Sequence, residues 1–331
     1  MLKQNFSLIQ TNQNSCNISD VLIIGLGNIG IINGWAFSEA GINVTHKVRQ
    51  GKAHLYRNEI NLDLLDKRKP DVEKKLAVYK PKIIDTYSKE NYFDLIMIPV
   101  KHYQLLDAVE ELTGVYPHAK YLLFSAIWGS LDEIDKLIPH SEYIMGYAAV
   151  NGGCQNKIYY FTVRKDYRVG ILQGNDESLY NGIKNMFSKA MFIPDEKENI
   201  LEWNWVHFGL NGALIGTSIY AGSIQNMIES DDMLKLMINA SKDSIKILAA
   251  LGINVKKYPE VNLYLEKSFE DIGNYFRKDF FGTEAGQRTL KTGHHLTAME
   301  EMKRYYFDVR NTGRKLGLDI PYLEKLGEKI S

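Results

Sequence analysis

The sequence has 331 residues, enough for two domains of ordinary size, and its 45% hydrophobic and 24% charged residues are typical of a folded globular protein. Lysine plus arginine and aspartate plus glutamate each number 40, so the formal net charge is zero. A neutral chain has no overall field that attracts nucleic acid or an anionic membrane, so we expect neither as a partner. A small molecule is the expected ligand.

The beginning of the chain carries no recognisable export signal. Residues 1–19 are polar and rich in Asn and Gln, without the apolar stretch of a signal peptide, and we interpret them as a loose extension. Cys16 and Cys154 are too few and too far apart for a disulfide framework or a thiolate metal site. We therefore expect a cytoplasmic protein without a bound metal.

A glycine-rich turn stands between a predicted strand and a predicted helix near the start of the fold. The apolar residues 21–24 lead directly into Gly25-Leu-Gly-Asn-Ile-Gly30, and residues 31–40 can form a helix. Further strands are expected at 43–48, 94–100 and 121–125, with a further helix at 104–112. Buried strands that alternate with helices form a doubly wound parallel sheet, so we predict an α/β fold that begins with a Rossmann domain.

The second half of the chain changes from strands to helices. Residues 158–172 are rich in strand-forming residues and predict an antiparallel addition at the edge of the sheet. Helices are then expected over 203–228, 233–251, 264–278 and 297–316. We predict a cofactor-binding domain over 1–197 and an all-helical domain over 198–331 that contributes to the substrate site and is suited to forming a homodimer.

Residues 203–228 contain no charged side chain, and a helix of that length could span a bilayer. Several polar residues lie within the segment, and each would be costly in contact with lipid. We therefore predict a buried helix of a globular domain rather than a membrane span.

The glycine-rich turn predicts a dinucleotide site because it lies in the strand–turn–helix context that gives the pattern meaning. Gly25 permits the tight turn, Gly27 lets the backbone approach a pyrophosphate, and Gly30 allows close packing of helix and strand. The phosphates would rest on free N–H groups at the start of the helix. The expected cofactor-binding residues are Gly25, Leu26, Gly27, Asn28, Ile29 and Gly30.

The end of the second strand decides between the two nicotinamide dinucleotides. An acidic residue at this place binds the ribose 2′-hydroxyl of NAD, whereas a basic residue accommodates the 2′-phosphate of NADP. The chain has Arg49 here, with Lys47 and Lys52 nearby, so NADP is favoured and NAD is less expected. The alternative is that Arg49 is an ordinary solvated surface residue.

Polar residues recur along the uncharged helix at steps of three, four and seven, at Asn204, His207, Asn211 and Ser218. Polar groups on one face of an apolar helix need partners, so this face is predicted to line a cleft that binds substrate. His207 could donate a proton to a carbonyl oxygen, because the ordinary pKa of an imidazole lies near neutral pH. A structural histidine, held by hydrogen bonds between the domains, is the equally open alternative.

In order and spacing, these features resemble the ketopantoate reductase family. The resemblance is carried by the glycine-rich turn, the Val48-Arg49-Gln50-Gly51 turn, Val100-Lys101 after the strand DLIMIPV, the helix from Trp205 to Asn211, and Glu301 ahead of Gly-Leu-Asp-Ile-Pro321. It implies an NADP-binding Rossmann domain followed by an all-helical domain.

The resemblance also implies roles for single residues. Lys101 would lie beside cofactor and substrate, Asn211 would bind substrate, and Glu301 would contact substrate and the catalytic residue. By position alone, Glu301 near the start of a helix would only compensate the helix dipole. The family's catalytic lysine corresponds to His207 here, and the usual Asn-Gly after the fourth strand is replaced within residues 124–129.

Three functions remain open from the sequence. The first is NADPH-dependent reduction of a small carbonyl compound such as a 2-oxo acid, with His207 as general acid and Asn211, Lys101 and Glu301 placing the substrate. The second is reduction of an imine, as in opine-type dehydrogenases, which the layout resembles more loosely. The third is a non-catalytic NADP-binding protein, because fold alone does not determine chemistry.

Overall fold

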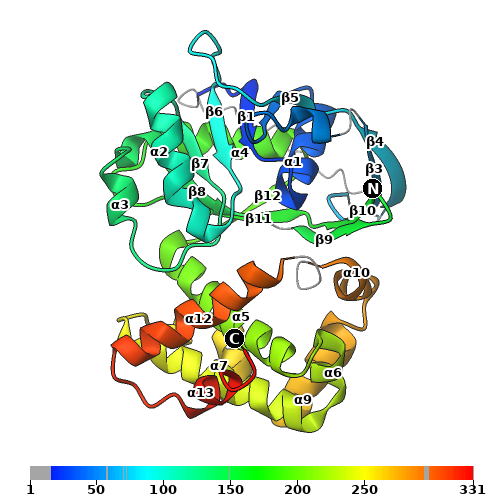
Figure 1. Cartoon of the computed structure of the whole chain (residues 1–331), viewed down its shortest axis with the longest axis vertical. Helices are drawn as coiled ribbons and strands as arrows, with labels where there is room; N and C mark the ends of the chain where they lie inside the picture. Colours follow the sequence, from blue (N-terminus) through cyan, green and yellow to red (C-terminus); the bar gives the residue numbers. More distant parts are fainter. Residues whose placement is uncertain are drawn as a thin grey trace, which may run out of the picture.

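The computed structural model describes residues 16–56, 59–69, 71, 73–148, 150–293 and 298–330. An α/β lobe lies above a helical lobe in Figure 1, and helix α5 leads from the first into the second. The predicted extension falls largely outside the described residues. Its last part is packed, because Ile18 is buried and the Cys16 amide donates to the Ser178 carbonyl oxygen.

The main sheet has eight strands in the described part of the chain, in the order β12-β11-β8-β7-β6-β1-β2-β5. Their bounds are β1 Asp20–Ile24, β2 Asn43–Lys47, β5 Lys82–Ile84, β6 Leu95–Ile98, β7 Tyr121–Leu123, β8 Tyr143–Tyr147, β11 Asp166–Gly170 and β12 Ile193–Glu196. Neighbouring strands are parallel along the run β8-β7-β6-β1-β2-β5, and β11 pairs antiparallel with β8. The accompanying helices are α1 Asn28–Glu39, α2 Leu105–Val115, α3 Asp132–Asp135 and α4 Glu177–Lys189. The predicted α/β fold with a Rossmann domain is confirmed.

A second sheet was not foreseen. Its order is β4-β3-β10-β9, with β3 Ile60–Asp66, β4 Glu73–Tyr79, β9 Val150–Gln155 and β10 Ile158–Val163. The prediction that residues 158–172 extend the main sheet is therefore wrong for β10, which pairs parallel with β3, and right for β11. The partner strand β3 lies far away in the sequence, so strand-forming residues alone could not reveal the pairing.

The remainder of the described chain is helical after β12. The helices are α5 Ile200–Tyr220, α6 Ile224–Glu229, α7 Asp231–Ala250, α8 Pro259–Glu266, α9 Phe269–Asn274, α10 Glu284–Thr292, α12 Met299–Lys315 and α13 Pro321–Leu326, with a π-helical turn at Tyr275–Phe280. The boundary between residues 197 and 198 stays a prediction, and it falls between β12 and α5. No helix within the described ranges combines the length and apolar character needed to cross a membrane.

Two of the predicted helices are interrupted. The segment 203–228 breaks at Gly222, whose φ of 87° ends α5, and the Ser223 side chain caps α6. The segment expected at 264–278 breaks at Ser268, which forms a capping box with Asp271 and so begins a new helix. The residues that end or cap helices at these two places therefore divide segments that apolar periodicity predicted as single helices.

Helix α5 packs unusually close to α12. A Cβ at Gly212 would lie 2.7 Å from a methyl carbon of Val309, and one at Gly216 would lie 2.7 Å from the ring of Tyr306. These glycines of the uncharged helix therefore make room for a neighbouring helix. The packing brings α12 alongside the polar face of α5.

Candidate active site

The glycine-rich turn between β1 and α1 is open to solvent where a phosphate would lie. Gly25 has a φ of 95°, which favours glycine, and Gly27 begins α1 without a side-chain cap. A Cβ at Gly25 or Gly27 would meet no atom within 4 Å, whereas one at Gly30 would lie 2.8 Å from the Gly25 carbonyl oxygen. The first two glycines leave space for an anion at the helix N-terminus, and the third permits close helix–strand packing.

Strand β9 lies between this turn and a segment of the helical lobe. The Asn28 side chain donates to the Gly152 carbonyl oxygen at 3.3 Å. A Cβ at the next residue, Gly153, would lie 1.9 Å from the carbonyl oxygen of Thr292, the last residue of α10. Strand β9 therefore contacts both the glycine turn and α10, which lies below β9 and β10 in Figure 1.

The basic residues at the end of β2 lie in different environments. Arg49 is exposed, as a residue that meets a 2′-phosphate must be. Lys47 is buried instead, where its ammonium group donates to the Val48 carbonyl oxygen at 2.8 Å and lies 4.3 Å from the centre of the Tyr87 ring. Lys47 therefore does not add positive charge at the surface as its position in the sequence suggested.

Lys101 and Glu301 lie together although they come from different lobes. Lys101 follows β6 at the carboxyl edge of the parallel sheet, and Glu301 lies in the first turn of α12. The Lys101 Nζ is 3.7 Å from a Glu301 carboxylate oxygen, and the two side chains are 37% and 14% exposed. This partly accessible ion pair lies at the sheet edge where α/β proteins bind their ligands.

His207 lies in a compact group of polar and aromatic side chains. Its Nε2 is 3.1 Å from the Tyr147 hydroxyl and 2.9 Å from the Asn211 amide nitrogen. The ring stacks on Trp203 with centroids 5.0 Å apart. Burial, assisted by the positive charge of Arg168, lowers the pKa of His207 to about 4. The imidazole is therefore neutral at pH 7 before any ligand binds.

Tyr147, Tyr305 and Arg168 belong to this group but were missed in the sequence. Tyr305 hydrogen-bonds to Tyr147, and burial raises the pKa of Tyr147 to about 12. Arg168 on β11 is the register partner of Tyr147 on β8, and its guanidinium lies 5.5 Å from the centre of the Trp203 ring. No spacing rule connects these residues, because the strand pairing and the docking of α12 bring them together.

Two residues of the predicted polar stripe have other partners. Asn204 is fully buried, and its side-chain oxygen accepts a hydrogen bond from the Ile127 amide at 3.2 Å, which fixes the loop after β7. Ser218 donates to the Ile215 carbonyl oxygen and lies about 16 Å along α5 from His207, at 1.5 Å per residue. The structure joins Asn211 with His207, and these contacts give no support for a substrate role of Asn204 or Ser218.

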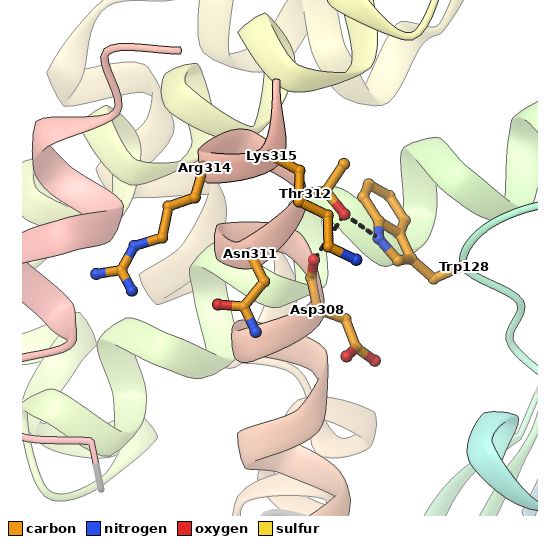
Figure 2. Close-up of a pocket in the computed structure, with 6 residues that line it drawn as sticks. All are labelled: Trp128, Asp308, Asn311, Thr312, Arg314 and Lys315. Atoms are coloured by element: carbon orange, nitrogen blue, oxygen red, sulfur yellow. Dashed lines mark hydrogen bonds between the residues drawn. The ribbon is translucent and has the colours of Figure 1, made fainter. Parts of the chain in front are cut away.

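A cavity of about 500 Å³ lies further along α12. Figure 2 shows the Trp128 side chain approaching α12 with its indole N–H directed at Thr312, and the Nε1 to Oγ1 distance is 2.9 Å. One turn earlier, Asp308 lies 3.0 Å from the His102 ring nitrogen. The face of α12 that begins at Glu301 therefore contacts the first lobe along several turns.

Comparison with known proteins agrees with this arrangement. Residues 21–174 match the family model described as Ketopantoate reductase PanE/ApbA. The chain is 22% identical over 261 residues to the 2-dehydropantoate 2-reductase of Pyrococcus abyssi, and the match covers 77% of this chain and 82% of that protein. The predicted resemblance to the family is confirmed.

Solved structures share the fold over nearly the whole chain. A 2-dehydropantoate 2-reductase from Geobacter metallireducens superposes with a TM-score of 0.70 at 14% identity, covering 94% of this chain and 98% of that one. D-mandelate dehydrogenase in complex with NADH gives 0.67 at 15% identity, covering 94% and 97%. The dimeric ketopantoate reductase of Staphylococcus aureus gives 0.61 at 15% identity, covering 93% and 97%. Residues 21–174 are therefore similar to the ketopantoate reductase PanE/ApbA family, whose members are oxidoreductases that act on a CH–OH or C=O group, and nearly the whole chain has the fold of the solved ketopantoate reductases.

Proposed function

We propose that this protein is an NADPH-dependent reductase of a small 2-oxo acid. The proposal rests on the position of three features at one edge of the parallel sheet. The open glycine turn follows β1, the Lys101–Glu301 pair lies after β6, and the Tyr147–His207–Asn211 group lies at the end of β8, of which Tyr147 is the last residue. A dinucleotide on the turn would direct its nicotinamide toward the polar groups.

The turn fits the pyrophosphate of such a cofactor. Gly25 and Gly27 leave the space that a side chain would fill, and the N-terminus of α1 has no side-chain cap to compete for its amides. When bound, NADPH supplies a hydride to the carbonyl carbon. The residues of this chain must then hold the substrate and deliver one proton to its oxygen.

His207 is the proposed proton donor. Its neutral imidazole takes up a proton as the anionic substrate binds, because a carboxylate nearby favours the charged form. The protonated ring then gives this proton to the carbonyl oxygen as the hydride reaches the carbon, and the imidazole becomes neutral again. Lys101 and Asn211 offer a cation and an amide donor for the substrate carboxylate, and Glu301 orients Lys101.

The pH dependence should reveal this protonation. Because the pKa of His207 is about 4 in the free protein, only about one molecule in a thousand is protonated at pH 7. If that form is the active one, kcat/KM for reduction should rise about tenfold for each unit that the pH falls between 8 and 5. The His207→Gln variant should lose this slope. A flat profile for the unmodified protein would remove His207 from the role of general acid.

Arg49 is proposed to select NADPH. Replacing it by Glu removes a cation and places a carboxylate against the 2′-phosphate, so the NADPH/NADH ratio of kcat/KM should fall by about 100-fold, as expected from a lost charged hydrogen bond of about 1.5–3 kcal/mol. Lys325→Glu, an exposed change on α13 in the helical lobe, serves as the charge-matched control. An unchanged ratio in Arg49→Glu would show that Arg49 is only a solvated residue.

The substrate class follows from the chemistry that the relatives share. 2-Dehydropantoate is a 2-oxo acid and mandelate is a 2-hydroxy acid, so both carry a carboxylate beside the carbon that is reduced or oxidised. The Lys101 ammonium and the Asn211 amide suit such a carboxylate. A panel of 2-oxo acids, with loss of NADPH absorbance as readout, tests the proposal. Binding of NADPH without its oxidation across the panel would favour a non-catalytic protein.

Assembly is a further part of the proposal. The Staphylococcus aureus neighbour is a dimeric ketopantoate reductase, and the helical domain of this chain has the same fold. We propose a homodimer through this domain. Sedimentation equilibrium at several concentrations would distinguish a dimer from a monomer.

A further inference from the structure

A buried histidine lies directly beneath the glycine turn. His46 is on β2 and is fully buried. Its Nδ1 lies 3.0 Å from the Gly25 carbonyl oxygen, and its Nε2 lies 2.7 Å from the Tyr79 hydroxyl. Tyr79 comes from β4 in the second sheet, so the ring connects that sheet with the turn. No catalytic step proposed above uses this histidine.

The hydrogen bonds around His46 can run in only one direction. A carbonyl oxygen can only accept, so Nδ1 must carry the proton that is donated to Gly25. Nε2 is then the acceptor, and the Tyr79 hydroxyl donates to it. Ser38 on α1 in turn hydrogen-bonds to Tyr79. Burial lowers the pKa of His46 to about 4 and raises the pKa of Tyr79 to about 12, so both are neutral over the physiological range.

Helix α1, which follows the turn, has a glycine where it packs against His46 and Tyr79. A Cβ at Gly34 would lie 2.5 Å from both the His46 Nε2 and the Tyr79 hydroxyl oxygen. One turn earlier, a Cβ at Gly30 would lie 2.8 Å from the Gly25 carbonyl oxygen. The two glycines therefore let α1 lie against both the turn and the histidine–tyrosine pair. The space that a side chain at position 34 would need is filled by groups that hold the turn.

Gly25 is consequently fixed on both sides of its Cα. Its amide donates to the Lys47 carbonyl oxygen at 2.7 Å, and its carbonyl accepts from His46. With these two bonds made, the peptide planes around Gly25 cannot rotate freely at a φ of 95°. The amides that follow are held in one orientation before any ligand binds, and preorganised donors bind an anion without an ordering cost.

We propose that His46, held in one tautomer by Tyr79, is a positioning residue that fixes the glycine turn for the dinucleotide pyrophosphate. This inference rests on the proposed cofactor site, but it does not depend on the substrate or on His207. It concerns binding of the phosphates rather than the hydride-transfer step. The measured quantity is therefore the dissociation constant of NADPH.

The test compares two ligands in the full-length protein. His46→Phe should raise the Kd of NADPH about tenfold, as expected from one lost hydrogen bond of about 1–1.5 kcal/mol. The Kd of adenosine 2′-monophosphate, which lacks the pyrophosphate, should stay within about twofold. His46→Asn should recover most of the NADPH affinity, because the Asn amide nitrogen can take the place of Nδ1. Turnover at saturating NADPH should change little in both variants.

Two results would overturn the inference. One is an unchanged Kd of NADPH in His46→Phe, and the other is an equal loss for both ligands, which would mark a general structural defect. If His46→Phe does not fold, Tyr79→Phe decides, because it removes only the hydroxyl and should weaken NADPH binding selectively by about threefold. If the unmodified protein fails to bind NADPH at all, the proposed function itself is wrong, so the two failures can be told apart.

Discussion

The His207→Ala variant is expected to lower kcat with NADPH and a 2-oxo acid by about 10²–10⁴, the usual contribution of a general acid. The ring lies between Tyr147 and Asn211, so its removal takes away the proton donor and opens a gap beside the substrate. Steady-state kinetics at saturating NADPH measures the loss. The Kd of NADPH should change by less than about threefold, because no phosphate contact is proposed for this residue.

The matched control is His118→Ala, since His118 is exposed in the loop between α2 and β7. This variant should keep the kinetics of the unmodified protein. Near-normal turnover in His207→Ala would contradict the mechanism and favour the alternative in which His207 only holds the lobes together. If His207→Ala loses turnover as expected but also has a lower melting temperature, His207→Gln decides, because its side chain keeps a hydrogen-bonding group near the position of Nε2.

Gly27→Val is expected to weaken NADPH binding by about 100-fold or more. Gly27 is exposed, and a Cβ there meets no protein atom within 4 Å, so the space it would fill is the space left for the pyrophosphate. Losing a hydrogen bond to a charged group costs about 1.5–3 kcal/mol, and each 1.4 kcal/mol is a factor of ten. Titration of NADPH fluorescence gives the dissociation constant.

The fold should tolerate this change, because Gly27 has a φ of −85°, in the extended region that other residues adopt. Gly114→Val is the matched control, since position 114 on α2 is also free of neighbours within 4 Å and lies outside the glycine turn. It should bind NADPH normally. Equal affinities of Gly27→Val and the unmodified protein would mean that the dinucleotide does not lie on this turn.

Much of the first lobe could be predicted because its signals are local. An apolar strand, the glycine spacing and the following helix are contiguous in the sequence, and the structure shows the tight turn expected at Gly25 and the close packing expected at Gly30. The approach of a pyrophosphate to Gly27 stays a prediction. The helix begins at Asn28 rather than at residue 31, so the last three residues of the glycine motif already form its first turn. The second sheet could not be foreseen, because β3 and β10 pair across a long stretch of chain.

The candidate site was only partly visible in the sequence. His207 and Asn211 share a face of one helix, so their spacing alone predicted that they meet. Lys101 and Glu301 come from different lobes, and only the family resemblance pointed to them. Tyr147 and Arg168 depend on the register of β8 and β11, for which the sequence holds no signal.

The same polar stripe also contained residues with structural tasks. Asn204 binds the backbone of the loop after β7, and Ser218 caps a carbonyl within its own helix. Helical periodicity places residues on one face, but it does not say which neighbour that face meets at each turn. Gly212 and Gly216 of α5 pack against α12, a neighbour that helical periodicity does not identify either.

A dinucleotide on the glycine turn should direct its nicotinamide toward the group around His207. A crystal structure of the protein with NADPH and oxamate, an unreactive 2-oxo acid analogue, tests it most directly. We expect the pyrophosphate against the amides of residues 25–30, the nicotinamide C4 about 3–3.5 Å from the oxamate carbonyl carbon, and the His207 Nε2 within about 3 Å of its oxygen. A dinucleotide bound elsewhere, or an oxamate held away from His207, would show that the glycine turn and His207 do not form one active site.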